Sequence, residues 1–324
     1  MTKLTFGRAV RLALTEAMEE DDRVFCYGED VGYGGAYGAT KGLQERFGAA
    51  RVRNTPILEA AIAGFAVGAA VAGARPVAEI MHMDFAAIAM DQIANQAAKL
   101  RYMFGAQTSV PLVIRMGIGG RMNEGAQHSQ SLEAWFTHVP GLKVATAGSP
   151  ADVRLVLRAA IRDENPAVVV EPVSIYDLVG EVPDEVEIPS LDHPLADTKR
   201  IGEHVTIITW GPMLPRVLEA ADELAVSGVQ AEVIDLLTLV PWDVERAVES
   251  VSRTSRAVVV HQAHRRAGFG AEVAATITEH AFDALDSPIL RVGSLDAPIP
   301  FSPPLEDYVM PSTQRVVDAV RSLM

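Results

Sequence analysis

Short β-rich runs alternate with helical patterns along almost the whole of this 324-residue chain. The runs in the first half carry no polar alternation, which is typical of strands that are buried on both faces. The expected strands are 23–27, 76–81, 110–116, 142–146 and 167–171, and the expected helices are 5–19, 84–102 and 150–162. Buried strands separated by helices predict a parallel sheet with helices on both of its faces.

A second series of the same kind follows the first. Its expected strands are 205–210, 230–236, 257–261 and 289–292, and its expected helices are 213–227, 243–251, 271–285 and 313–323. Segment 176–204 has no sustained period, and it carries Pro183, Pro189 and Pro194 among many acids, as linkers do. The sequence predicts two doubly wound α/β domains, residues 1–180 and 204–324, joined by a linker at 181–203.

Composition narrows the class of protein. A net charge of −14 excludes a nucleic-acid partner, because phosphate binding needs clustered Lys and Arg. The aliphatic run 60–74 falls short of the roughly 20 residues of a spanning helix, so no membrane segment is expected. The N-terminus shows no secretory signal, and the single Cys26 suits a reducing compartment. A cytoplasmic protein is expected.

The sharpest local anomaly is Glu59, after which no charged residue occurs until Arg75. Thr55 is expected to cap a helix whose first residue is Pro56. Two interpretations stay open at this point. A carboxylate at a helix start is stabilised by about 0.3–1 kcal/mol by the helix dipole. The helix looks buried on all sides, however, and an unpartnered buried carboxylate is costly unless a function requires it.

A second candidate is His128, in the run 125–130 that follows the glycine-rich loop 117–120. Histidine titrates near physiological pH, and loops at the carboxyl ends of parallel strands bind ligands in α/β folds. A histidine that only hydrogen-bonds its own loop is the alternative. No phosphate-binding glycine loop, zinc spacing or Gly-x-Ser-x-Gly turn is present in the sequence.

The chain resembles the β subunits of the decarboxylating component of 2-oxo acid dehydrogenase complexes, of the pyruvate, branched-chain and acetoin types. The matching segments follow the family's order over nearly the whole chain. They are 28–32, 55–59, 75–79, 84–85 with 90–93, 125–130, 140–144, 160–166, 206–211 and 268–272. The resemblance implies a transketolase-like pyrimidine-binding domain followed by a transketolase C-terminal-like domain.

The resemblance also implies a cofactor, thiamine diphosphate, that is shared with an α subunit whose own residues hold magnesium. Glu59 matches the glutamate that hydrogen-bonds a ring nitrogen of the aminopyrimidine, which is an acid–base contact. His128 matches the histidine that faces the substrate and helps the acyl group to pass to a lipoyl arm. The implied pocket around the pyrimidine is lined by Ile57, Leu58, Met81, Met83 and Phe85.

A potassium loop is a further implication, with mostly backbone oxygens as ligands, which suit a hard cation. Its residues are Leu112, Ala160, Ile161, Asp163 and Asn165. The alternative is simply the C-terminal turn of a helix. Two segments depart from the family: 188–195 lacks the usual Gly-Lys entry to the second domain, and Gln262 stands where an acid is common.

The implied activity is oxidative decarboxylation of a 2-oxo acid, or cleavage of acetoin, with reductive acylation of lipoamide. Segments 101–105 and 128–136 favour the pyruvate or acetoin type. The implied oxidoreductase works only as an α2β2 heterotetramer with a lipoyl-bearing acyltransferase. Two alternatives remain: a biosynthetic subunit that hands an acyl or ketol group to another carrier, and a non-catalytic assembly paralogue. A self-sufficient transketolase is not expected, because no Gly-Asp-Gly-type motif is present.

Overall fold

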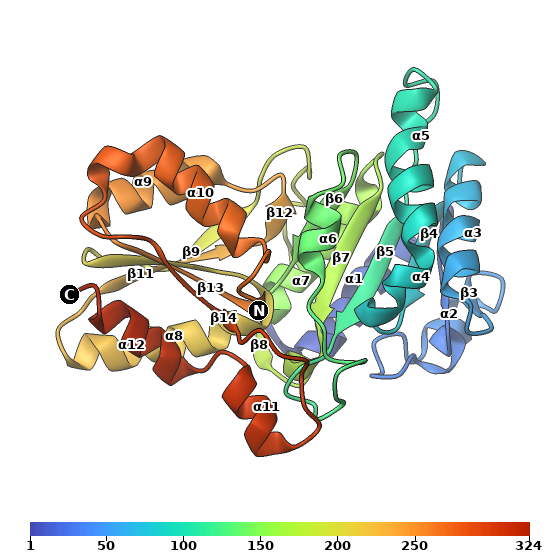
Figure 1. Cartoon of the computed structure of the whole chain (residues 1–324). Helices are drawn as coiled ribbons and strands as arrows, with labels where there is room; N and C mark the ends of the chain where they lie inside the picture. The colour runs from blue at the N-terminus through green and yellow to red at the C-terminus, as the bar shows by residue number, and fades with distance from the viewer.

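The computed structural model describes residues 1–324 and consists of two α/β units side by side (Figure 1). The first unit is built on a seven-stranded sheet of order β12-β6-β7-β5-β4-β2-β3, in which only β12 runs antiparallel to its neighbour. Its strands are β2 Val24–Gly28, β3 Val52–Asn54, β4 Arg75–Ile80, β5 Val113–Ile118, β6 Lys143–Thr146, β7 Ala167–Pro172 and β12 Thr238–Val240.

Helices cover both faces of this sheet. On one face, α1 (Phe6–Glu20) packs against α7 (Pro150–Arg162) over a core of 28 buried residues. Thr5 caps α1, and Ser149 caps α7 with a proline in its first turn, so both helices begin where the sequence signals a start. The remaining helices of this unit are α2 Leu43–Phe47, α3 Glu59–Val71, α4 Ala86–Met90, α5 Ala98–Met103 and α6 Glu133–Thr137.

The second unit contains a five-stranded sheet of order β14-β13-β10-β11-β9, in which only β9 is antiparallel. Its strands are β9 Ala196–Arg200, β10 Val205–Thr209, β11 Ala231–Leu236, β13 Ala257–His264 and β14 Leu290–Ser294. Helices α8 and α12 lie on one face, and α9 and α10 on the other (Figure 1). The helices are α8 Leu214–Val226, α9 Val244–Thr254, α10 Gly270–Ala281, α11 Pro303–Val309 and α12 Thr313–Arg321.

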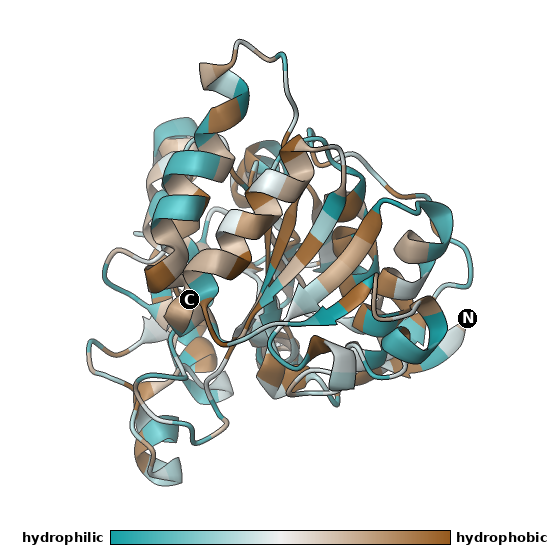
Figure 2. Cartoon of the chain, turned by 90° about the vertical axis from the view of Figure 1, so that its right-hand side faces the viewer, coloured by the Kyte–Doolittle hydropathy of each residue, from teal (hydrophilic) through white to brown (hydrophobic).

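The hydropathy of the ribbon follows this layering: the central strands are largely hydrophobic, and hydrophilic residues gather on outward-facing helix surfaces (Figure 2). Thus the doubly wound α/β architecture predicted from the sequence is confirmed. No helix combines the length and the apolar composition that crossing a bilayer requires.

Two differences from the expected elements affect the linker and the site. Residues 196–200, which the sequence assigned to the linker, form β9 and pair with β11, while β8 (Val179–Val182) pairs with β1 (Thr2–Thr5). The single helix expected at 84–102 is broken into a 3-10 turn, α4, a π-helical stretch at Asp91–Ala97 and α5. Periodicity alone does not reveal either feature, because strand pairing is non-local and a π-helical turn leaves the apolar pattern intact.

Candidate active site

Helix α3 begins at Glu59, and this first helical residue is only 8% exposed. No side chain or backbone group of the chain donates a hydrogen bond to its carboxylate, and no cation pairs with it. The helix start differs from the prediction. It has no side-chain cap, and Thr55 lies four residues earlier with its hydroxyl oxygen buried and unpartnered. The Thr55 amide instead donates to the Gly28 oxygen at 2.9 Å, which ties this turn to the end of β2.

The prediction that α3 is buried on all sides is wrong for the isolated chain. Phe65 is 50% exposed, although its ring meets those of Phe25 and Tyr27 of β2 edge to face, and Val71 is exposed as well. A side chain at Gly64 would lie 3.3 Å from the Gln92 amide oxygen, so this glycine does allow the π-helical stretch to approach α3. Gly68 has nothing beside it. An apolar sequence does not distinguish burial within a fold from burial by a partner.

The surroundings of Glu59 are acidic. Burial, together with the nearby carboxylates of Asp30 and Glu59, raises the pKa of Glu29 above its usual range. The N-terminus of α3 provides positive potential at Glu59. A mostly buried carboxylate with these neighbours is suited to accept a hydrogen bond from a ligand N–H group.

The structure brings Phe85 and His128 together. Their rings meet edge to face, with centroids 5.3 Å apart, and both side chains are half-buried. Phe85 lies in the 3-10 turn Met83–Phe85 that follows β4, and His128 lies in the loop after β5. Both segments follow the carboxyl ends of adjacent parallel strands, where α/β folds place ligands.

The remaining predicted pocket residues differ in exposure. Ile57 and Leu58 precede Glu59 and are 69% and 54% exposed, so their surfaces are open to a ligand or a partner. Met81 is half-buried. Met83 is fully buried within the larger core cluster, and it offers a ligand no surface. Met83 therefore packs in the core next to the site and does not line it.

The loop that carries His128 is fixed from two sides. Asp84 accepts hydrogen bonds from the Gln130 backbone amide at 3.1 Å and from its side-chain amide at 2.9 Å. Burial raises the pKa of Asp84, although both bonds to Gln130 lower it. A side chain at Gly119 would collide with the His128 carbonyl oxygen, so only glycine permits this close approach.

The second unit reaches the same loop through Gln262. Its amide nitrogen donates to the Gly119 oxygen at 2.9 Å and to the Ser131 hydroxyl oxygen at 2.8 Å. A carboxylate at this position would have no proton to donate to the Gly119 oxygen. The departure from the family at Gln262 therefore has a structural role here, since it joins the two domains beneath His128.

Three residues of the site were not singled out from the sequence: Tyr37, His82 and Glu124. The Tyr37 hydroxyl lies 3.1 Å from His82 Nε2 and 3.1 Å from a carboxylate oxygen of Glu124. The His82 ring meets the His128 ring edge to face, with centroids 5.4 Å apart. Because 45 residues separate Tyr37 from His82, no local sequence motif indicates that these three residues meet.

The predicted potassium loop is ordered by two side-chain cations. Arg75 Nη1 donates to the backbone oxygens of Ile161 and Asp163, at 3.0 Å each. Lys143 pairs with the buried Asp163 carboxylate, which also accepts from Asn165. The oxygens of Leu112 and Ala160 accept backbone amides. No group of three His, Cys, Asp or Glu is placed to hold a metal ion.

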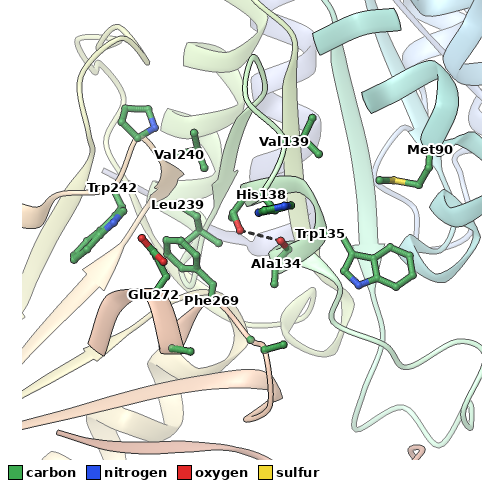
Figure 3. Close-up of a pocket in the computed structure, with 15 residues that line it drawn as sticks. Met90, Ala134, Trp135, His138, Val139, Leu239, Val240, Trp242, Phe269 and Glu272 are labelled. Atoms are coloured by element: carbon green, nitrogen blue, oxygen red, sulfur yellow. Dashed lines mark hydrogen bonds between the residues drawn. The ribbon is translucent and has the colours of Figure 1, made fainter. Parts of the chain in front are cut away.

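An open crevice of about 870 Å³ lies between the two units, apart from all the residues considered so far (Figure 3). Met90 and Trp135 line it from the first unit, and Trp242, Phe269 and Glu272 from the second. None of the predicted site residues contributes to its walls.

Comparison with known proteins agrees with this geometry. Residues 2–177 match the family model of the transketolase pyrimidine-binding domain, and residues 195–316 match that of the transketolase C-terminal domain. Together they define a transketolase-like chain. A split gene transketolase, solved as an inactive beta4 tetramer, superimposes with a TM-score of 0.79 at 25% identity over 99% of this chain and 98% of its own.

Relatives that align over their full length identify a family within the transketolase-like proteins. The pyruvate dehydrogenase E1 component subunit beta of Porphyra purpurea is 41% identical, over 100% of this chain and 98% of its own. The acetoin:2,6-dichlorophenolindophenol oxidoreductase subunit beta of Cupriavidus necator is 41% identical (99% and 98%). The 2-oxoisovalerate dehydrogenase subunit beta of Bacillus subtilis is 42% identical (100% and 99%). The chain belongs to this family of dehydrogenase β subunits, which confirms the resemblance noted in the sequence.

Proposed function

We propose that this chain is the β subunit of a thiamine-diphosphate-dependent 2-oxo acid dehydrogenase of the pyruvate or acetoin type. With an α subunit it would decarboxylate its substrate and transfer the acyl group to the lipoamide of an acyltransferase. The observation that carries the proposal is Glu59, a buried carboxylate at a helix start with no donor from its own chain. Its neighbourhood supplies what a bound aminopyrimidine requires, which is an acceptor for an N–H group on a residue that is itself mostly buried.

In this proposal the chain binds and orients, while thiamine diphosphate, when bound, supplies the electron sink for decarboxylation. Glu59 accepts a hydrogen bond from the aminopyrimidine and thereby controls where the proton on that ring resides. No cation of the chain competes for its carboxylate. The half-buried Phe85 ring provides an apolar surface against the cofactor ring.

His128 is proposed to face the substrate and to assist transfer of the acyl group. Its ring is half-buried, so it is accessible to a reacting group yet held by Phe85 on one side. Imidazole changes its protonation state near neutral pH and is therefore suited to deliver and receive a proton at the acyl carrier.

The uncovered apolar face around α3 supports an α subunit as partner. Large apolar side chains stand exposed along α3, from its Glu59 end to its last residue, and on neighbouring helices. They are Ile57, Leu58, Phe65, Val71 and Ile88, with Tyr102, Met103 and Phe104 at the end of α5. Exposed apolar surfaces of this kind mark protein interfaces. We propose that the α subunit covers this face in an α2β2 particle and contributes the magnesium and diphosphate contacts.

Two finer assignments belong to the same proposal. We place the proposed potassium loop at the backbone oxygens around Asp163, where a potassium ion would share two of them with Arg75 and lie near the Lys143–Asp163 ion pair. The protein works in the cytoplasm, where its single free cysteine, Cys26, stays buried and reduced.

Reconstitution with the α-like subunit tests the proposal, with pyruvate, branched-chain 2-oxo acids and acetoin as substrates. Glu59→Gln should fold normally and lower turnover by about 10²–10⁴-fold, because an acid–base contact is lost. Glu45→Gln is the matched control, since Glu45 is an exposed glutamate in the first turn of another helix, and it should retain full turnover. Wild-type turnover in the Glu59→Gln complex would refute the role of Glu59.

The alternative of a ketol-transferring subunit has one observation in its favour, the similarity to a split gene transketolase. The dehydrogenase subunits are far closer in sequence, at 41% against 25% identity over the whole chain. An assay for ketol transfer between sugar phosphates by the reconstituted complex decides between them. Activity in that assay, without acylation of lipoamide, would favour the alternative. A complex that binds no cofactor at all would indicate an assembly paralogue.

A further inference from the structure

Two histidines lie edge to face beside Phe85. His82 precedes the 3-10 turn that carries Phe85, and its side chain is buried, whereas the His128 side chain is half-buried. Their ring centroids are 5.4 Å apart with the planes nearly perpendicular, at 85°. His128 is therefore confined between the rings of Phe85 and His82.

The ring of His82 is in turn fixed by a hydrogen-bonded series. A carboxylate only accepts, so the Tyr37 hydroxyl donates to Glu124, at 3.1 Å. The Tyr37 oxygen then accepts the Nε2–H of His82, also at 3.1 Å. Burial and the carboxylate of Glu124 raise the pKa of Tyr37, so the phenol keeps the proton it donates. This network assigns the proton of neutral His82 to Nε2.

Tyr37 itself is well anchored. Its ring meets the half-buried ring of Tyr176 edge to face, at 5.8 Å between centroids. Gly35, two residues earlier, adopts a positive φ of 68° against the Glu79 carboxylate, so the loop that carries Tyr37 is seated on the end of β4.

The surroundings of His82 determine its protonation state. Burial lowers the pKa of His82 and outweighs the carboxylate of Glu124, which raises it; the charge of His128 lowers it further, and Asp84 raises it slightly. These groups, with Tyr37, are the titratable neighbours of His82. His82 is therefore the neutral partner near physiological pH.

We infer that His82 is a positioning residue for His128, held in place through Tyr37 and Glu124. The inference rests on the role proposed above for His128 in acyl transfer. The series Glu124–Tyr37–His82 fixes one ring, and the edge-to-face contact transmits that orientation to the ring that acts on the substrate. A displaced proton carrier costs rate even when its own chemistry is unchanged.

Variants of the reconstituted complex test this inference. His82→Leu removes the N–H donor, whereas His82→Gln retains an amide N–H near the position of Nε2. Tyr37→Phe breaks the series without touching either histidine. His82→Leu and Tyr37→Phe should each lower the rate of lipoamide acylation about tenfold and shift its pH profile. His82→Gln should recover most of that rate. Tyr33→Phe, an exposed tyrosine of the same loop, should match the wild type.

A readout that needs no activity separates this inference from the proposed function. Acylation of His128 by diethyl pyrocarbonate, followed by mass spectrometry of the isolated chain, reports how firmly its ring is held. The reaction should become severalfold faster in His82→Leu and Tyr37→Phe, and should stay unchanged in Tyr33→Phe. If His82→Leu does not fold, Tyr37→Phe alone decides. Equal acylation rates in Tyr37→Phe and the wild type would overturn the inference, whereas an inactive wild-type complex would count only against the proposed function.

Discussion

Replacement of Arg115 should strongly destabilise the first domain. Its guanidinium donates to Glu171 from Nε at 2.7 Å and from Nη2 at 2.6 Å, and to Glu79 from Nη1 at 2.6 Å. Only 3% of the Arg115 side chain is exposed, and Tyr176 donates to Glu171 as well. Arg115→Met leaves two carboxylates buried without their cation, which costs about 3–5 kcal/mol. For a domain of this size the unfolding temperature should fall by on the order of 10 °C.

The pH dependence of this loss provides a second check. Burial raises the pKa of Glu79, and the charge of Arg115 opposes that rise, so the pKa should rise further in Arg115→Met. A carboxyl group whose pKa is higher in the folded protein than in the unfolded chain destabilises the fold as the pH rises above its pKa in the unfolded chain. The deficit of the variant should therefore be larger at pH 7.5 than near pH 5.

Urea unfolding followed by circular dichroism measures both effects. Arg266→Met is the matched control, because Arg266 makes an ion pair with Asp296 at 2.8 Å in which the side chains are 78% and 58% exposed. Surface pairs contribute about 0–1 kcal/mol, so this control should be nearly neutral. A loss in Arg115→Met no larger than in the control, at neutral pH, would contradict the reasoning.

Two predictions concern the second domain. Gln262→Glu removes the donor to the Gly119 oxygen and should lower the free energy of unfolding, measured in urea, by about 1–3 kcal/mol. An unchanged urea midpoint would argue against the hydrogen bond of Gln262 as a link between the two domains. His261 is fully buried and stacked on Trp210, and burial lowers its pKa from 6.5 to about 4. Because the unfolded chain takes up this proton more readily, stability is lost as pH falls from about 6.5 towards 4. His261→Leu should remove up to about 3 kcal/mol of that loss. If the free energy of unfolding of the variant falls with pH as steeply as that of the wild type, His261 is not the group responsible.

Much of the fold could be predicted because its elements are marked locally. The run 167–171 is apolar throughout, as a strand covered on both faces must be, and it forms β7. Helix α7 begins at Pro150, directly after its Ser149 cap, and ends at Arg162, both as predicted. Strand β12 has only three residues, and it exists because β6 offers it an edge, so nothing in its own sequence marks it.

The site could be predicted only where one residue is anomalous by itself. Glu59 stands out as a carboxylate within an aliphatic segment, and its burial is confirmed. The start of its helix was predicted wrongly, because Thr55 and Pro56 fit a cap that the chain does not form. His82 lies between two methionines, and the tyrosine that binds it comes from a distant loop, so only the folded chain reveals their contact.

Strand β12 lies in the C-terminal half of the chain, yet it completes the sheet of the N-terminal half, with Thr238 opposite Ala145 and Val240 opposite Val144. A cut or a gene split within the connection 183–195 would leave an N-terminal fragment whose β6 edge has lost its neighbour. Bare edges of this kind recruit other chains and promote aggregation. The two halves would then need to be synthesised together, so that they associate before the bare β6 edge pairs with another chain. A large hinge motion between the two units would also first have to break the hydrogen bonds between β12 and β6.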